Sequence, residues 1–426
     1  MQGLVKSLTI VLAFAALLQL PGTLLAQQQE GDVKSTRDNS SQAKPNDGDA
    51  APAEIRIGNV MPYTGALAAF GSIGRTESAY FDMLNEHGGI NGRKIKFISY
   101  DSSSDAVTSF KLTHRLVDGD KVLLLFGSFA LPGDLALRPY LNQRSIPNLF
   151  VASGDRGWSD PHRYPWSMGW QPPFRAEGRI YANYIQASYP EGKIAVIWQN
   201  DQFGRDLYMG LQEGLGDLAH MIVSDITFDA SDRSINSQVD LMRSSGADIL
   251  IFDGAPAMAA MAIRHMIEID WHPVFILDNA SASIANTLQP AGLQNSIGVI
   301  STAFLKDADD PAWKDDPAMK QWSSFMDKYY PDGDKDDSNT VFGYAAAETL
   351  AQVLKQCGDD FSRENIMRQA EALKGYQSPV SLPGITVNTG PEDFHPIKQM
   401  RLVQFDGNTW QPIGEVIESA FLGNEE

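Results

Sequence analysis

Small polar residues directly follow two apolar runs of this sequence, at positions where loop residues can bind a ligand. Ser128 follows the run at 121–126, and Ser153 and Gly154 follow the run at 146–151. Hydroxyl groups and unpaired backbone N–H groups near a helix start favour an anion, because the helix dipole is positive there. The pattern predicts a carboxylate-binding site. Serines that only cap helices would give the same pattern.

Charged and aromatic residues lie next to these loops. Asp155 and Arg156 follow the second loop, and Arg156 is a candidate partner for a ligand carboxylate or for Asp155 itself. Phe129 follows Ser128. The other aromatic candidates for the same site are Phe70, Trp170 and Phe203. Together these rings would form an apolar, stacking pocket, although ordinary packing is an equal explanation for each ring taken singly.

Residue patterns that would indicate catalysis are missing from the sequence. We find no nucleophile elbow, phosphate-binding loop, dinucleotide fingerprint or zinc-protease motif. The segment at 332–337 begins like a calcium loop, but its sixth position is Asp337 instead of glycine and its twelfth is Gly343 instead of glutamate. We therefore expect no enzymatic activity, no metal site and no cofactor.

Composition narrows the class of partner. The 426 residues are enough for two domains with a sizeable core. The net charge of −19 argues against nucleic acid and anionic membranes, since both require basic surfaces. The single cysteine, Cys357, has no partner for an internal disulfide, and we expect it to be buried. We expect a monomer.

The N-terminal residues have the pattern of an export signal. Lys6 precedes an apolar run at 8–20 that is short for a membrane span, and Ala26 closes a passable cleavage site. Residues 1–26 are therefore predicted to be a cleavable signal peptide that directs the chain to the periplasm. Residues 27–53 are polar and are predicted to be a disordered linker.

The remaining chain alternates short apolar runs with amphipathic helical patterns, which is typical of a doubly wound α/β fold. The segment at 158–174 interrupts this alternation because it is rich in proline and tryptophan. We expect the first crossing between two lobes there. The predicted strands are 55–60, 95–100, 121–126, 146–151, 193–198, 221–227, 248–252, 274–277, 298–301, 400–405 and 410–416.

One stretch near the start carries two specific motifs. Residues 62–71 follow the pattern P-x-T-G-x-x-A-x-x-G, and residues 85–93 follow N-E-x-G-G-I-N-G-R. With this spacing the sequence resembles periplasmic solute-binding proteins of the branched-chain amino-acid type, which feed ABC importers. The resemblance runs from about Ile55 to Val416.

This resemblance implies two Rossmann-like lobes joined by a three-segment hinge, with the ligand in the cleft between them. The expected boundaries are 54–172 plus 302–385 for the first lobe and 173–301 plus 386–420 for the second, followed by a tail at 421–426. In the family, the loops at Ser128 and Ser153 hold the ligand carboxylate. Phe70 and Phe203 stand where amino-acid-binding relatives often have tyrosine.

The resemblance also bears on the ligand's amino group. A buried ammonium needs a carboxylate or tyrosine partner, since an unpaired buried charge is costly. The family supplies such groups from two loops, and aligned with them here are Ala255 or Pro256 and Asn279. Asp253 and Asp278 lie nearby but are displaced by one residue. We therefore favour a ligand without an α-amino group, such as an aromatic or aliphatic carboxylic acid.

The expected function is capture of a small organic acid by hinge closure and its delivery to an inner-membrane ABC permease. An amino-acid-binding protein of the same fold remains an alternative, as does a soluble sensor that acts on a separate membrane partner. An exported hydrolase is a third, disfavoured by the missing nucleophile motifs.

Overall fold

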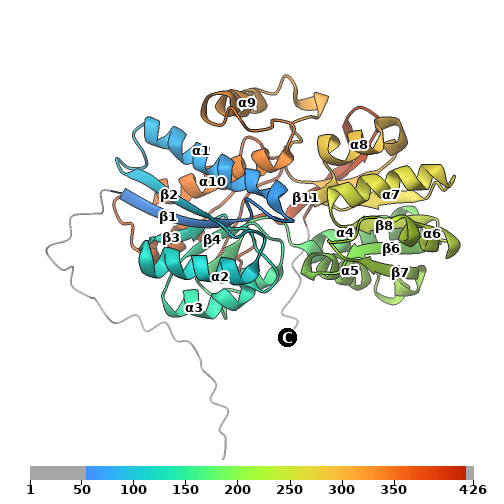
Figure 1. The fold of residues 1–426 in the computed structure, drawn as a ribbon, viewed down its shortest axis with the longest axis horizontal. Helices are drawn as coiled ribbons and strands as arrows, with labels where there is room; N and C mark the ends of the chain where they lie inside the picture. The colour runs from blue at the N-terminus through green and yellow to red at the C-terminus, as the bar shows by residue number, and fades with distance from the viewer. Residues whose placement is uncertain (1–53, 419–426) are drawn as a thin grey trace, which may run out of the picture. The chain divides into compact units, whose positions relative to one another are not determined.

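The structure is a computed structural model that describes residues 54–418 (Figure 1). The predicted signal peptide (1–26), linker (27–53) and tail (421–426) lie outside the described residues. Within residues 54–418, none of the helices combines the length and apolar character that a membrane span requires. The described chain forms two β-sheets, each covered by helices.

The first sheet has five parallel strands in the order β2-β1-β3-β4-β5. Its strands are β1 (Glu54–Met61), β2 (Lys94–Asp101), β3 (Leu124–Phe126), β4 (Asn148–Val151) and β5 (Ser167–Gly169). β5 lies in the segment rich in proline and tryptophan, where the sequence pattern predicts no strand. It can pair there because β4 offers an open edge, and tertiary pairing overrides weak local propensity.

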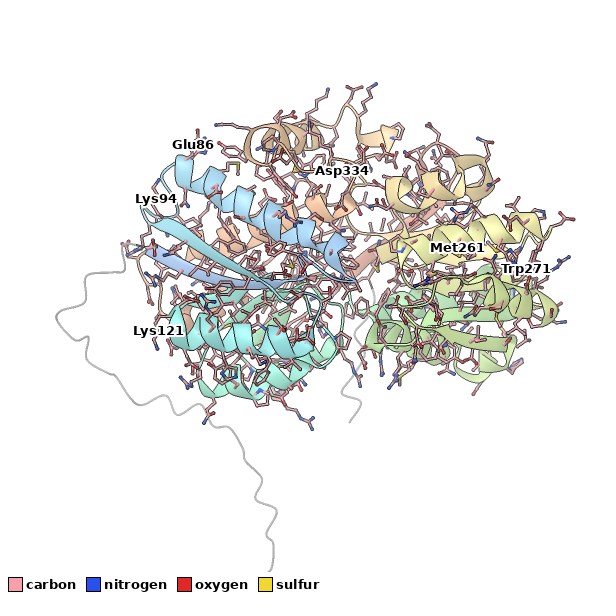
Figure 2. All side chains as sticks on the ribbon, viewed as in Figure 1. Glu86, Lys94, Lys121, Met261, Trp271 and Asp334 are labelled. Carbon is pink, nitrogen blue, oxygen red and sulfur yellow. The ribbon has the colours of Figure 1, made fainter. Side chains whose placement is uncertain are left out.

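Helices from two separate stretches of the chain, 71–143 and 317–370, cover this sheet. They are α1 (Gly71–Glu86), α2 (Ala106–His114), α3 (Arg138–Gln143), α9 (Pro317–Tyr329), α10 (Ser338–Gln356) and α11 (Arg363–Ala370). α10 packs against α1, and the rings of Tyr80 and Tyr344 meet edge to face with centroids 5.1 Å apart. Exposed charged residues such as Glu86 and Lys94 project from the outer surface (Figure 2).

The second sheet has seven strands in the order β12-β11-β10-β9-β8-β6-β7. Its strands are β6 (Ile194–Gln199), β7 (Ile222–Phe228), β8 (Ile249–Asp253), β9 (Val274–Leu277), β10 (Ile300–Ala303), β11 (Gln399–Phe405) and β12 (Trp410–Glu418). The five strands from β7 to β10 are parallel, and β11 and β12 add an antiparallel hairpin beside β10.

The helices of the second sheet are α4 (Phe174–Ser188), α5 (Gln202–Leu215), α6 (Asn236–Ser244), α7 (Pro256–Glu268) and α8 (Gln289–Ala291). α4 and α5 pack closely through glycines. A Cβ on Gly178 would stand 2.2 Å from the carbonyl oxygen of Leu207, so only glycine allows this approach.

Short 3₁₀ and π turns connect many of these elements. They lie at Ala68–Phe70, Arg115–Gly119, Asp134–Leu137, Arg156–Ser159, Gly216–Met221, Asn279–Ser281, Ile284–Leu288, Leu293–Ser296 and Pro311–Trp313.

The chain passes between the two sheets at three places. It leaves the first sheet after β5, leaves the second after β10, and returns to the second at β11. The strands β1 to β5 are parallel to one another, as are β6 to β10, so the loops after these strands gather at one edge of each sheet.

Candidate functional site

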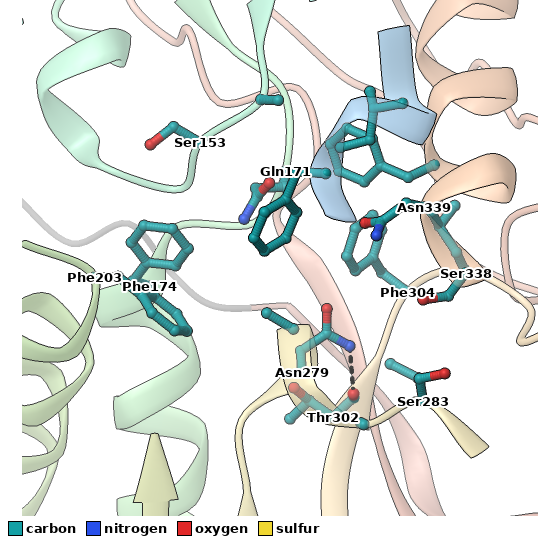
Figure 3. A pocket seen from close by; sticks show the side chains of 18 of the residues that line it. Ser153, Gln171, Phe174, Phe203, Asn279, Ser283, Thr302, Phe304, Ser338 and Asn339 are labelled. Atoms are coloured by element: carbon teal, nitrogen blue, oxygen red, sulfur yellow. Dashed lines mark hydrogen bonds between the residues drawn. The ribbon is translucent and has the colours of Figure 1, made fainter. Parts of the chain in front are cut away.

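A cavity of about 1000 Å³ lies between the strand-end loops of the two sheets (Figure 3). The loops after β1, β3 and β4 line it from the first sheet, and the loops after β6, β9 and β10 line it from the second. The start of α10 and the β11–β12 hairpin complete the wall. Of the predicted site residues, Phe70, Phe129, Ser153, Asp155, Phe203 and Asn279 line this cavity.

Two pairs of phenylalanine rings face the cavity from opposite sheets. Phe70 and Phe129 belong to the first, with ring centroids 4.7 Å apart. Phe203, at the start of α5, meets Phe174 edge to face at 4.6 Å (Figure 3). Phe174 was not among the residues predicted from the sequence. It follows two prolines and begins α4, and this position at the start of a helix is the signal that could have identified it. The cavity therefore offers apolar, aromatic surface on both sides.

The loops at Ser128 and Ser153 have fewer unpaired backbone N–H groups than the sequence pattern predicts. The N–H groups of Phe129, Ala152 and Ser153 donate to Val60, Ser128 and Val151, respectively. Ser128 lies outside the cavity lining, and its Oγ accepts a hydrogen bond from the N–H of Val60 at 3.1 Å.

Ser153 is the serine that reaches the cavity. Its Oγ accepts from the N–H of Asp155 at 3.1 Å, so the hydroxyl proton remains able to donate to a ligand. Gly154 is absent from the lining; its carbonyl accepts from the N–H of Phe174, and a Cβ there would stand 2.7 Å from that ring.

Asp155 and Arg156 take separate positions. Asp155 lines the cavity and caps a 3₁₀ turn by accepting the N–H of Gly157 at 2.7 Å. Burial raises the pKa of Asp155 above its ordinary value. Arg156 is exposed and does not line the cavity.

Trp170 is part of the core. Only 1% of its surface is exposed, and its ring meets Phe150 edge to face at 5.3 Å. Phe150 has a φ of 55°, and the pairing of β4 with β5 shifts register between Asn148 and Val151. The irregular backbone lies next to the place where Trp170 packs into the core, and residue spacing in the sequence does not reveal it.

Asp253 is also withdrawn from the cavity. It is fully buried, and neither carboxylate oxygen has a hydrogen-bond partner. Burial, together with the neighbouring Asp278, raises the pKa of Asp253 well above its ordinary value. Asp278 is buried too, and its carboxylate accepts the N–H groups of Gly254 and Ser281 at 3.1 and 2.9 Å.

Asn279 brings a polar group to the cavity from the same loop. Its Nδ2 donates to the carbonyl oxygen of Thr302 at 2.6 Å (Figure 3). Because a carbonyl oxygen only accepts, the amide nitrogen must face Thr302, and the Oδ1 is turned toward the cavity. Gln171, from the segment between the sheets, and Asn339, on α10, add further amides to the lining.

A buried glutamate that the sequence analysis missed holds this loop. The Oε1 of Glu177, on α4, accepts from the hydroxyl of Tyr181 at 2.6 Å, the N–H of Asn279 at 2.6 Å and the hydroxyl of Thr302 at 2.9 Å. Burial raises the pKa of Glu177, and these hydrogen bonds oppose the rise. A glutamate on the apolar face of α4 was the available signal.

Most charged groups of the cavity wall already have protein partners. Lys306 pairs with Asp316 at 2.9 Å and also donates to the carbonyl oxygen of Pro379. Each of the aspartates that line the cavity accepts at least one backbone N–H; these are Asp155, Asp201, Asp307 and Asp310. Burial raises the pKa of Asp307 to about 6. Among residues 54–418, no group of three or more His, Cys, Asp or Glu side chains is placed to hold a metal.

Relatives of known type share most of this chain. An amino acid binding protein of Pseudomonas aeruginosa is 26% identical over 318 residues, which cover 72% of this chain and 80% of the relative. A Leu/Ile/Val-binding protein homolog of Brucella abortus is 24% identical and covers 74% of this chain and 82% of the relative. These relatives are solute-binding proteins rather than enzymes.

Solved structures share the fold. A branched-chain amino acid ABC transporter protein of Thermus thermophilus with bound valine superposes with a TM-score of 0.78 at 15% identity, covering 86% of this chain and 97% of that one. A fatty acid ABC transporter substrate-binding protein of Thermomonospora curvata gives 0.70 at 18% identity, covering 86% and 93%. The predicted α/β fold with two sheet lobes is confirmed.

The family model named periplasmic binding protein matches residues 54–409, which is nearly the whole described chain. Its description agrees with the two motifs at 62–71 and 85–93 and with a ligand-sized cavity between two α/β sheets. The chain belongs to the periplasmic binding protein family and is a substrate-binding protein of the ABC-transporter type.

Proposed function

We propose that the protein captures a small organic acid in the periplasm and delivers it to an inner-membrane ABC permease. The observation that carries this proposal is the cavity between the two sheets, with aromatic rings on both walls and polar side chains such as those of Ser153 and Gln171 in its lining. Such a cavity buries an apolar body and orients it through a small number of hydrogen bonds.

The arrangement of acidic groups favours a ligand without an α-amino group. Asp253 is buried away from the cavity, and Asp278 uses its oxygens on backbone N–H groups. The lining residue at that place is Asn279, an amide without charge. An ammonium held at this loop would therefore lack the carboxylate partner that its desolvation requires, and the aspartates that line the cavity elsewhere each already accept at least one backbone N–H. For the carboxylate of the ligand, the Ser153 hydroxyl is available as a hydrogen-bond donor.

Capture would proceed by hinge closure of two lobes, comprising residues 54–172 plus 302–385 and residues 173–301 plus 386–420. Ligand contacts to both walls stabilise the closed form, because a ligand shifts a conformational equilibrium through its stronger binding to one state. A monomer suffices for this mechanism. Residues 1–26 would direct export, and the linker at 27–53 and the tail at 421–426 would lie outside the lobes.

Amino-acid capture is the second candidate function. The Oδ1 of Asn279 faces the cavity and is a hydrogen-bond acceptor that an α-ammonium could use. The relatives from Pseudomonas aeruginosa and Brucella abortus are named as amino-acid-binding proteins. The names alone do not discriminate between the candidates, but the ligand's amino group does.

A thermal-shift screen of residues 27–426 tests both candidates. One panel contains branched-chain and polar amino acids, and the other contains aromatic and aliphatic carboxylic acids with their amides. A ligand that binds only the folded state raises the melting temperature by mass action. We expect shifts with the acids and none with the matching amides. Shifts confined to the amino acids would replace the first candidate with the second.

A further inference from the structure

Arg401, on β11, is a partly buried cation in the cavity wall. None of the ion pairs found within residues 54–418 includes it. The other cations that line the cavity differ from it, because Lys306 is paired with Asp316 at 2.9 Å and Arg205, on α5, is exposed to solvent. Arg401 therefore combines partial burial with a charge that the described part of the protein does not neutralise.

The position of Arg401 in its strand directs the side chain to the cavity. Arg401 and Val403 are alternate residues of β11 and both line the cavity, as does Ala303, which pairs with Arg401 from β10. Met400 and Leu402 are buried in the hydrophobic core. Because side chains alternate between the two faces of a sheet, this pattern places Arg401 on the cavity face.

The pairing of β11 with β12 is irregular at the same residue. The register shifts between Met400 and Leu402, so that Arg401 stands opposite residues 414–416 of β12. Gly414 has a φ of 65°, a left-handed conformation that glycine adopts readily. Its carbonyl oxygen accepts a hydrogen bond from the Nη2 of Arg401 at 3.0 Å. Bulges in strand pairing redirect side chains beside binding sites, and this one holds the guanidinium group in place.

Most of the hydrogen-bonding capacity of Arg401 is unused within residues 54–418. A guanidinium group has five N–H donors, and the bond to Gly414 uses one of them. The Nε is buried and has no hydrogen-bond partner in this part of the chain. Because an unpaired buried donor is costly, such a donor beside a cavity indicates an acceptor that arrives with a ligand. The planar donors of arginine match the two oxygens of a carboxylate.

The carboxylates of the same wall are bonded to other groups. Asp310 reaches the β11–β12 hairpin, where its oxygens accept the N–H of Trp410 and the hydroxyl of Thr409. Asp307 accepts two backbone N–H groups. Neither forms an ion pair with Arg401. The charge of Arg401 is therefore available to an anion in the cavity.

We propose that Arg401 binds a second carboxylate of the ligand, so that the ligand class is dicarboxylic acids with an apolar or aromatic body. This inference rests on the proposed function, in which the hydroxyl of Ser153 contacts the first carboxylate. Ser153 follows β4 of the first sheet, whereas Arg401 belongs to β11 of the second. A ligand that contacts both residues carries an anionic group at each end, and the aromatic rings of the two walls contact the body between them.

Calorimetric titration of dicarboxylates and their monomethyl esters tests the ligand class. Succinate, adipate, suberate and terephthalate form the panel, because they hold two carboxylates at different separations on aliphatic and aromatic bodies. We expect the diacid that binds best to bind at least tenfold more tightly than its monomethyl ester, since the ester has a carboxylate at only one end.

The outcomes separate this inference from the proposed function. Binding of the esters, or of the monocarboxylic acids of the thermal-shift screen, without tighter binding of any diacid would overturn the inference and leave capture of organic acids intact. Absence of binding by the diacids, the esters and the monocarboxylic acids would overturn both.

Two substitutions at Arg401 test where the second carboxylate binds. Arg401→Met removes the charge and the donors, whereas Arg401→Lys keeps the charge and loses the planar arrangement of donors. We expect the advantage of the best diacid over its ester to fall below twofold in Arg401→Met and to be partly retained in Arg401→Lys. Calorimetry with both compounds measures this advantage in each variant.

Arg264→Met is the matched control. Arg264, on α7, is also partly buried and donates to one backbone carbonyl, that of Pro290 at 2.7 Å, but it lies outside the cavity lining. The advantage of the diacid should be unchanged in this variant. An advantage that persists in Arg401→Met, or one that falls equally in the control, would overturn the assignment of Arg401.

Discussion

Each sheet has a buried glutamate on the helix beside its cavity wall, but the two glutamates are held differently. Glu77, on α1, receives one hydrogen bond, from the amide of Asn59 to Oε2 at 3.1 Å, and its Oε1 has no partner. Glu177, on α4, receives three hydrogen bonds, all at Oε1. Two of the three come from Asn279 and Thr302, which line the cavity.

This difference shows that the loops of the two sheets are held in place by different kinds of hydrogen bond. The first wall depends on sheet hydrogen bonds, because the loop at Phe129 is tied to β1 through Val60 and the loop at Ala152 is tied to Ser128. The second wall depends on a buried polar network centred on one side chain. Such networks rigidify a structure when every member is satisfied, and they fail together when one member is lost.

Replacement of Glu177 should therefore break the second wall. Glu177→Ala removes three hydrogen bonds and leaves the N–H of Asn279 and the hydroxyl of Thr302 without this acceptor, whereas the hydroxyl of Tyr181 keeps the carbonyl oxygen of Leu277. We therefore expect the free energy of unfolding to fall by about 3 kcal/mol. Glu77→Ala loses one hydrogen bond and should cost about 1 kcal/mol by the same measure. Urea denaturation of both variants measures the contrast. Glu177→Gln keeps an acceptor at the same place and is the control. Equal losses at Glu77 and Glu177 would contradict the comparison.

Asp253 tests the acidic cluster behind the second wall. Its folded-state pKa is raised by burial, while an unfolded aspartate has a pKa of about 3.9. The folded state therefore binds the proton more tightly, and stability is lost as pH rises above the unfolded value. Asp253→Asn should stabilise the protein by about 2 kcal/mol at pH 7 and have little effect below about pH 4. Melting temperatures at the two pH values check this, and a destabilised variant at pH 7 would show that the carboxylate is needed.

The aromatic pairs test whether the two walls contribute equally to binding. Phe203→Ala removes a ring that meets Phe174 and should weaken an organic-acid ligand by at least about 1 kcal/mol, or about fivefold. Phe70→Ala should have a similar effect through its pair with Phe129. Calorimetry with the acid that gives the largest thermal shift measures both. Unchanged affinity in one variant would remove that ring from the binding surface.

The smallest effect is expected at Arg156. Its side chain is exposed and lies outside the cavity lining, so Arg156→Ala should change both ligand affinity and unfolding free energy by less than about 0.5 kcal/mol. The same calorimetric and urea measurements apply. A tenfold loss of affinity would instead identify Arg156 as the carboxylate partner that the sequence offered.

Most helices and strands could be predicted from the sequence because the apolar patterns that mark them lie within short stretches of the chain. Apolar runs mark the buried strands, and β9 begins and ends at the residues expected for it. The loops after strands in a parallel sheet necessarily share an edge, which is why Phe70, Phe129, Ser153 and Phe203 meet at one cavity although they are far apart in the chain.

The direction of single side chains required the tertiary structure. Ser128 and Trp170 lie beside the correct loops, yet one bonds to β1 and the other packs on Phe150. A shift of one residue in strand register places a side chain on the opposite face of the sheet. The irregular pairing of β4 with β5 cannot be predicted from the spacing of residues in the sequence. Glu177 was missed for a related reason, since its partners come from α4, β10 and the loop after β9.

The sequence by itself determined the α/β class, the alternation of most strands and helices apart from β5, and the family, because periodicity and the two motifs are properties of contiguous residues. The tertiary structure alone decided which charges are paired, which carboxylates are hidden, and that the cavity extends along β11 and β12. Those features depend on contacts between segments up to hundreds of residues apart, and burial and hydrogen bonding are set only when the chain brings them together.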